Sequence, residues 1–267
     1  MYESVEGLDI EVSGDVLTVT LNAPERRNAL TDQSVSGLIR ALETASTDES
    51  LRAIALTGAG DHFCGGFDIV GRNRTDGARP RTGSIQRRIP VASGRVISLL
   101  LTIQLPVVCA VRGWAVGIGA QLALAADITV ASDDARIWWP FLDRGFTPDS
   151  ASTWLLPRLV GPVRARQLLL LAREISGAEA AAMGAVALAV PSSRVSEAAE
   201  EVLARLAAGP TVALGLTKSL LATTWDHGLS SQLAAEAHAM ELSSRSPDFR
   251  EGLSALSEKR PPEFRGR

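Results

Sequence analysis

Residues 52–68 read RAIALTGAGDHFCGGFD: an apolar strand runs into a Gly-Ala-Gly break and then into two glycines in front of Phe67 and Asp68. Glycine carries no side chain, so a glycine pair after a strand lets the backbone approach a ligand or another segment closely. The same order recurs in residues 107–121, VVCAVRGWAVGIGAQ, where a small-residue helix is predicted to follow. Such turns leave N–H groups unpaired at a helix start, and two N–H groups converging on one oxygen form an oxyanion hole. From the glycines alone, an oxyanion hole and two purely structural turns are equally open.

The segments around these turns alternate between strand and helix patterns. Strands are predicted where apolar residues alternate or run unbroken, and helices where they recur every three to four residues, as after the capping residue Thr31. This alternation predicts an α/β fold with a strand-and-helix core in residues 1–200 and an all-helical region in residues 201–267. The predicted strands are 16–21, 52–57, 107–111, 128–131 and 187–190, and the predicted helices are 32–44, 91–105, 120–126, 164–173, 178–183, 195–208, 211–224, 229–243 and 249–256.

The composition narrows the class of protein. The chain has 267 residues, 46% of them hydrophobic, and a net charge of −3, which is typical of a globular protein and gives no global attraction to nucleic acid or an anionic membrane. No apolar run reaches the roughly 18 residues of a membrane span, and the first nine residues lack a signal pattern, so we expect a cytoplasmic location. Cys64 and Cys109 are then expected to be reduced packing residues.

Residues 72–88 form the one strongly basic segment. Six arginines lie in it against the single acidic residue Asp76. The pattern is typical of a solvated surface loop. The alternative is a lid whose charge attracts a phosphorylated ligand.

Several common motifs are absent or incomplete. Gly117-Ile-Gly119 lacks the third glycine of a dinucleotide-binding turn, and neither a phosphate-binding Gly-Lys-Ser/Thr nor a Gly-x-Ser-x-Gly elbow is present. His62 and Cys64 have the spacing of metal ligands, but the other two histidines lie in the predicted helical tail, so we expect no metal site. With three histidines in the chain, acid–base chemistry is expected to fall to a carboxylate.

The candidate carboxylate is Asp149. It follows Pro148 and precedes a predicted helix that carries residues 154–156, so one interpretation is a helix cap. The other is a general base, because the apolar stretch 137–142 upstream would raise the pKa of a neighbouring carboxyl group toward neutrality.

Four stretches resemble the enoyl-CoA hydratase/isomerase (crotonase) superfamily. They are NAPERRNAL (22–30), LTGAGDHFCGGFD (56–68), CAVRGWAVGIGAQ (109–121) and GFTPDSASTW (145–154), and the tail REGLSALSEKR (250–260) also matches. The resemblance implies a spiral core of ββα units, a C-terminal helical trimerisation region, and homotrimers or dimers of trimers. It also implies an acyl-CoA thioester substrate and no separate cofactor, because CoA is part of the substrate.

The resemblance further implies the residues of the site. The backbone N–H groups of Phe67 and Ile118 are expected to form the oxyanion hole for the thioester oxygen, and the Phe67 ring is expected to narrow the acyl pocket. The residues expected along the substrate and its CoA moiety are Arg27, Ala29, Gly65, Asp68, Ile69, Gly117, Gln121, Pro140, Phe141 and Lys259.

The chain departs from the family's hydratases at their two catalytic glutamates. These positions hold Gln121 and Phe141, and neither side chain can take a proton from water. Asp143 lies nearby without an assigned place in the pocket. Asp149, in contrast, occupies the position of the catalytic aspartate in isomerase branches.

The stretch 148–158 resembles the ring-epoxide acyl-CoA isomerases of the phenylacetate pathway, although Ala151-Ser152 replaces their usual Gly-Gly and Arg112 replaces an asparagine. We therefore expect an acyl-CoA isomerase with Asp149 as the catalytic residue. The alternatives are an enoyl-CoA hydratase and a non-catalytic acyl-CoA-binding member. RNA binding, known in some relatives, is not favoured because helix 32–44 carries only Arg40 as a cation.

Overall fold

The computed structural model of the protein describes residues 2–69, 71 and 81–267. Within them lie a six-stranded sheet in the order β1-β2-β3-β4-β6-β9 and a three-stranded sheet in the order β5-β7-β8. In the large sheet β1 pairs antiparallel with β2, and all other neighbours pair in parallel. The predicted α/β class is confirmed. The strands are β1 (Gly7–Ser13), β2 (Val16–Asn22), β3 (Ala53–Gly58), β4 (Val107–Val111), β5 (Trp114–Val116), β6 (Ile128–Ser132), β7 (Arg136–Trp138), β8 (Ile175–Ser176) and β9 (Leu188–Val190).

The chain repeats a strand–strand–helix unit across the two sheets. β4 of the large sheet is followed by β5 of the small sheet and by α5 (Ile118–Ala125), and β6 is followed in the same way by β7 and α6 (Ser152–Leu170). β3 leads to Cys64, which bridges to Ala115 of β5, and later to α4 (Ser93–Thr102). This order agrees with the ββα spiral that the resemblance implies.

Both faces of the large sheet are covered. β4 is buried on both sides, as its unbroken apolar sequence predicts: Cys109 lies in the main core, while Val108 packs with Val130 against α8 (Val195–Ala207). The main core also takes the apolar residues of α1 (Asp32–Ala45), α4 and α5. Thr31 caps α1 as predicted, because its side chain accepts the N–H of Ser34 at 3.2 Å.

The elements that the sequence predicts differ from those of the structure mainly at their ends, while β1, β5, β7, β8 and α3 were not predicted. α5 begins two residues earlier than predicted, at Ile118, and α4 is shorter than the predicted helix 91–105. The helix predicted at residues 154–156 and the one predicted at 164–173 form one element, α6, which bends at Gly161 (φ 79°). The other elements are α3 (Ser84–Arg88), α7 (Gly177–Ala182), and the 3-10 turns η1 (Pro24–Arg26), η2 (Ile89–Val91), η3 (Leu142–Arg144) and η4 (Ser192–Arg194).

The structure describes only part of the basic segment 72–88. Arg72, Arg74 and Arg79 lie outside the described residues. At its other end the loop prediction is wrong, because residues 84–88 form the helix α3.

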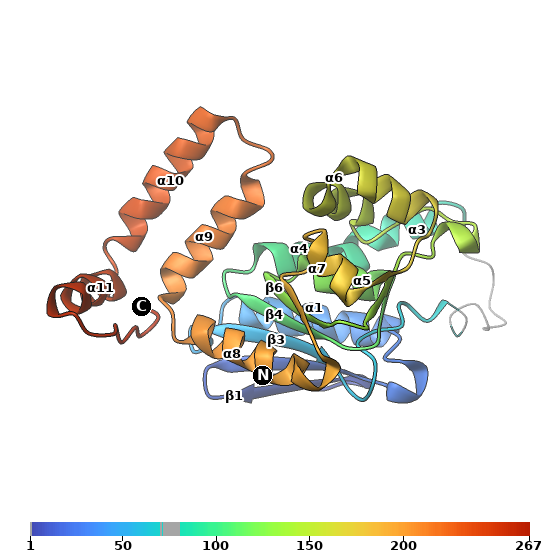
Figure 1. Cartoon of the computed structure of the whole chain (residues 1–267), viewed down its shortest axis with the longest axis horizontal. Coiled ribbons are helices and arrows are strands. Elements are labelled where there is room, and N and C mark those ends of the chain that lie inside the picture. Colours follow the sequence, from blue (N-terminus) through green and yellow to red (C-terminus); the bar gives the residue numbers. More distant parts are fainter. Residues whose placement is uncertain (1, 70, 72–80) are drawn as a thin grey trace.

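The C-terminal helices extend from one end of the body (Figure 1). They are α9 (Thr211–Thr223), α10 (Leu229–Ser243) and α11 (Pro247–Glu258), and α9 and α10 lie side by side. No residue of α10 is buried. The predicted division at residue 200 falls within α8, which packs on the sheet, and the division stays a prediction. None of the helices in the described part of the chain is both long and apolar enough to cross a membrane.

Candidate active site

The first glycine turn is held against the segment before α1. Gly65 donates its N–H to the carbonyl oxygen of Arg27 at 2.6 Å. A Cβ on Gly65 would lie 3.2 Å from that oxygen, and a Cβ on Gly66 would lie 3.1 Å from the carbonyl oxygen of Val116. Close backbone approach on two sides therefore requires the glycine pair, as the sequence predicts.

Gly66, at φ 101°, turns the chain so that Phe67 bridges to Leu30. Leu30 donates its N–H to the carbonyl of Gly66 and accepts the N–H of Asp68, both at 2.8 Å. In a parallel bridge of this pattern the N–H of the middle residue, Phe67, points away from its partner. On that other side lies β5, where the N–H of Cys64 meets the carbonyl of Trp114 at 2.7 Å. The amide of Phe67 is thus directed toward the side of the second glycine turn.

The second turn places another amide at a helix start. Gly117 adopts φ 53° and donates its N–H to the carbonyl of Trp138 at 2.9 Å. Ile118 is the first residue of α5, so the helix offers its N–H no carbonyl four residues earlier. The two amides that the family resemblance implies for the oxyanion hole lie on adjacent turns, joined by the bridge between Cys64 and Ala115.

Phe141 and Gln121 lie against the second turn. A Cβ on Gly117 would be 3.9 Å from Cζ of Phe141, and the Phe141 ring meets the Phe146 ring edge to face at 5.7 Å between centroids. Gln121 follows Gly117 by one helical turn and is 0% exposed. Neither position carries an acid, so the structure contains no glutamate pair at these two positions.

Asp149 lies on a tight bend before α6, three residues after Phe146. Its carboxylate accepts the hydroxyl of Ser150 at 2.9 Å, and its carbonyl accepts both the N–H (2.9 Å) and the hydroxyl (2.6 Å) of Ser152. Ser150 and Ala151 both adopt left-handed backbone angles, φ 49° and φ 63°. The bend therefore holds the backbone of Asp149 in one place.

The surroundings of Asp149 favour the base over the cap. Burial raises the pKa of its carboxyl group, and the Ser150 hydroxyl opposes that shift. The N-cap of α6 is Ala151, and no side chain caps the helix start. The helix-cap interpretation of Asp149 is therefore wrong.

The other predicted residues divide between the turns and the rest of the molecule. Asp68 accepts the N–H of Gly71 at 2.7 Å, and Ile69 donates its N–H to the carbonyl of Phe67 at 2.8 Å. Arg27 is exposed, with its guanidinium 5.9 Å from the centre of the Trp114 ring. Ala29 is half-buried beside this segment, and Pro140 is buried next to Phe141.

Two residues are not brought to the turns. Lys259 is the C-cap residue of α11, and α11 lies at the far end of the molecule from α5 and α6 (Figure 1). Within one chain it does not join the other candidate residues. Asp143 is exposed on η3.

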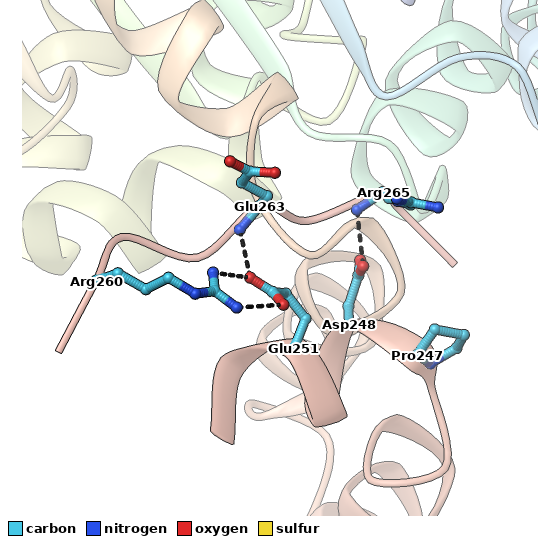
Figure 2. A pocket seen from close by; sticks show the side chains of 6 residues that line it. All are labelled: Pro247, Asp248, Glu251, Arg260, Glu263 and Arg265. Atoms are coloured by element: carbon cyan, nitrogen blue, oxygen red, sulfur yellow. Dashed lines mark hydrogen bonds and ion pairs between the residues drawn. The ribbon is translucent and has the colours of Figure 1, made fainter. Parts of the chain in front are cut away.

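Charged clusters elsewhere are already paired. Among residues 2–69, 71 and 81–267, no group of three or more His, Cys, Asp or Glu side chains could hold a metal ion. A cavity of about 430 Å³ lies between α11 and the C-terminal tail, where Arg260 forms a two-pronged ion pair with Glu251 at 2.6 and 3.0 Å (Figure 2). Asp248 accepts the N–H groups of Arg265 and Gly266. These bonds anchor the tail.

Two residues that position the site were not singled out from the sequence. Asn28 is 1% exposed, and its amide accepts the N–H of Ala23 and donates to the carbonyls of Ala59 and His62. It ties the segment before α1 to the loop that carries the first glycine turn. Ser150 is the second, and the only local signal for it is a hydroxyl residue beside Asp149.

Comparison with known proteins gives consistent matches. The model of the enoyl-CoA hydratase/isomerase family matches residues 11–267. The 1,2-epoxyphenylacetyl-CoA isomerase of Escherichia coli is 37% identical, over 96% of this chain and 97% of its own, which supports the predicted branch. A probable enoyl-CoA hydratase of Rhodobacter capsulatus is 38% identical over the same shares. The crystal structure of a putative enoyl-CoA hydratase from Streptomyces coelicolor has a TM-score of 0.91 and 34% identity, and the match covers 98% of this chain and 94% of that one.

Proposed function

The chain belongs to the enoyl-CoA hydratase/isomerase family, and from this we propose that it is an acyl-CoA isomerase that moves a proton with Asp149. The observation that carries the proposal is the environment of Asp149: a carboxylate with a raised pKa, bonded to a hydroxyl and held on a fixed bend. Gln121 and Phe141 supply no second acid. One carboxylate is sufficient when a proton is moved and water is not added.

In the proposed reaction the thioester oxygen lies between the amides of Phe67 and Ile118. Asp149 takes a proton from the α- or γ-carbon of the acyl group, and the electron pair delocalises onto the thioester oxygen as a thioenolate. The two amides stabilise that negative charge. Removing one such donor typically raises the activation barrier by about 2.7–4 kcal/mol. Asp149 then returns the proton to the other carbon, so that a double bond migrates and no atom is gained or lost. The Phe67 ring would limit the size of the acyl group.

The direct test compares Asp149→Asn with Asp143→Asn. Asp143 is the exposed aspartate six residues upstream, so its substitution controls for the loss of a charge. We expect Asp149→Asn to lower kcat/KM for double-bond migration by about 10²–10⁴-fold. Calorimetry should show that it still binds acyl-CoA, and Asp143→Asn should retain turnover. Near-normal isomerisation by Asp149→Asn would contradict the assignment of Asp149 as the catalytic residue.

Hydration is the second candidate, because relatives with similar identity are named hydratases. In that case Gln121 would orient a water molecule. A turnover screen over enoyl-, dienoyl- and aryl-acetyl-CoAs, with products identified by mass, separates addition of water from migration of a double bond. Binding without any turnover would favour the non-catalytic alternative.

We also propose a homotrimer or a dimer of trimers built through the C-terminal helices. α9, α10 and α11 expose large apolar side chains that a partner copy would cover. They include Leu221, Leu229, Leu233, Met240, Leu242, Leu253 and Leu256. Light scattering of the purified chain measures the mass directly.

A further inference from the structure

The outer face of the small sheet carries a stack of two tryptophans and an arginine. Trp114 of β5 lies opposite Arg136 of β7, and the Arg136 guanidinium lies over the Trp114 ring, 3.8 Å from its centre. Trp138, two residues further along β7, approaches the same ring with 6.1 Å between centroids. Side chains alternate between the two faces of a strand, and the neighbouring Ala115 and Ile137 are buried in the main core. The three stacked side chains, which we call the outer stack, therefore lie on the face away from that core.

The backbone of the same two tryptophans holds the two glycine turns. The carbonyl of Trp114 accepts the N–H of Cys64 at 2.7 Å, at the start of the first turn. The carbonyl of Trp138 accepts the N–H of Gly117 at 2.9 Å, directly before Ile118 in the second turn. Each turn that carries an amide expected in the oxyanion hole is therefore bonded to a residue whose side chain belongs to the outer stack.

The outer stack is also fixed to the segment that follows α6. Arg136 donates two hydrogen bonds to Glu174, at 2.6 and 3.0 Å, and the indole N–H of Trp138 donates to the carbonyl of Ala172 at 2.7 Å. The strands of this sheet are two or three residues long, so few backbone bonds hold them in place. In so short a sheet, contacts between cross-strand side chains contribute a large share of the stabilisation.

We propose that the outer stack sets the separation between the two amides of the oxyanion hole, and that its three members are positioning residues for the reaction. The inference rests on the proposed function, in which the amides of Phe67 and Ile118 bind the thioester oxygen. Such donors stabilise developing charge when they lie about 2.7–3.1 Å from the oxyanion. Without the stack, β5 and β7 shift against each other, and the carbonyls that hold the two turns move with them.

The test reads the polarisation of the thioester carbonyl. Hydrogen bonds from the two amides lower its stretching frequency, which vibrational difference spectra measure on bound butanoyl-CoA with an isotope label at the carbonyl carbon. Butanoyl-CoA is saturated, so it has no double bond to migrate. Arg136→Gln removes the guanidinium, and we expect it to reduce the frequency shift. In the turnover assay its kcat should fall about 2- to 5-fold, because the stack constrains the turns by no more than the strength of an exposed cation–π contact.

Variants of Trp114 separate stacking from the loss of a charge. Trp114→Leu removes the ring on which the other two side chains stack, so its kcat should fall further, about 2- to 12-fold, as for the loss of an aromatic pair. Trp114→Phe keeps an aromatic ring and should retain most of the frequency shift. Arg95→Gln is the matched control, because the Arg95 guanidinium on α4 also donates two hydrogen bonds to a glutamate, Glu43, at 3.1 and 2.8 Å. It should leave both the frequency shift and kcat unchanged.

The contrary results distinguish this inference from the proposed function. If the unaltered protein does not bind butanoyl-CoA, or binds it without lowering the carbonyl frequency, both are overturned. If the shift is normal in the unaltered protein and persists in Arg136→Gln and Trp114→Leu, the inference alone is overturned. Urea unfolding might then still show both variants to be destabilised, which is the result expected of a purely structural stack. The inference is also overturned if Trp114→Phe behaves as Trp114→Leu does, or if Arg95→Gln reduces the shift equally.

Discussion

Asp127 and Asp149 are two partly buried carboxylates whose surroundings differ in one respect. Asp127, between α5 and β6, accepts from Nζ of Lys218 at 2.6 Å and from the N–H of Val107 at 2.7 Å. Asp149 has the hydroxyl of Ser150, and none of the ion pairs between residues that the structure describes includes it. Burial raises the pKa of both carboxyl groups, but only at Asp127 does a cation oppose the shift.

Within the described part of the chain, the presence or absence of a cation partner distinguishes a structural carboxylate, Asp127, from a candidate catalytic one, Asp149. Lys218 lies on α9 and also donates to the carbonyl of Leu105, so its pair with Asp127 joins the C-terminal helices to the core. Lys218 counteracts the effect of burial on the pKa of Asp127. At Asp149 the Ser150 hydroxyl is the group that counteracts it, and the absence of a cation from its described surroundings suits a group that must take a proton and return it.

The largest expected effect is on stability, at Lys218. Lys218→Met leaves the partly buried carboxylate of Asp127 without its cation, so we expect the free energy of unfolding to fall by about 1–3 kcal/mol. The pKa of Asp127 should then rise further, and a group with a raised folded pKa stabilises only below its unfolded value. The loss should therefore be smaller near pH 4 than near pH 7, as measured by urea unfolding.

The double variant Asp127→Asn with Lys218→Met is the control. Removing both charges should be less damaging than the sum of the two single changes, because the partners act together. Additive losses would show that the pair does not couple α9 to the core.

At Asp149 we expect removal of the charge to raise the free energy of unfolding, the opposite of the effect at Lys218. The carboxyl group has a raised pKa in the fold, so ionising it at neutral pH destabilises the folded state. Asp149→Asn should raise the free energy of unfolding at pH 7, by at most ~2 kcal/mol. The gain should disappear below about pH 3.9, where an ordinary aspartate is already neutral. A loss of stability at pH 7 would place Asp149 with Asp127 as a structural residue.

Local sequence patterns predicted most of the fold. Strands such as β2 and β4 were predicted because their own apolar residues match their burial, and the start of α1 was predicted because Thr31 is a typical N-cap residue. β5, β7 and β8, each of two or three residues, were missed, whereas β9, also of three residues, was predicted from its apolar sequence. β1 was missed although Leu8, Ile10 and Val12 alternate, and of these only Leu8 is buried.

Local patterns located the two glycine turns and the carboxylate before a helix, but left open whether each is structural or functional, and the family resemblance supplied the roles. The pairing of residues distant in sequence leaves no local pattern: Asp127 and Lys218 are 91 positions apart. The stacking of Arg136 on Trp114 is likewise a property of neighbours in space, which no local pattern records.

A smaller effect, on the pKa of Asp149, is expected from Ser150 but not from Ser152. The Ser150 hydroxyl bonds the carboxylate of Asp149, while the Ser152 hydroxyl bonds its carbonyl. Ser150 favours the ionised form, so Ser150→Ala should move the acidic limb of the pH–rate profile to higher pH. On the acidic side kcat/KM should fall about 2- to 12-fold, the worth of one hydrogen bond.

Ser152→Ala is the matched control and should leave the position of the limb unchanged. Equal displacement by both variants would mean that the bend as a whole, and not the Ser150 hydroxyl, sets the pKa of Asp149.

The smallest expected effect concerns the bend itself. Ala151 and Ala172 both adopt left-handed backbone angles, φ 63° and φ 45°, but only Ala151 lies beside Asp149. Glycine relieves the crowding of such angles, so each Ala→Gly change should stabilise the fold by about 0.5–1 kcal/mol. Ala172→Gly should leave kcat unchanged. Ala151→Gly loosens the backbone that positions the carboxylate, and we expect its kcat to fall although its stability rises. Equal kcat in the two variants would show that the hydrogen bonds of Ser150 and Ser152 hold Asp149 without help from the strained bend.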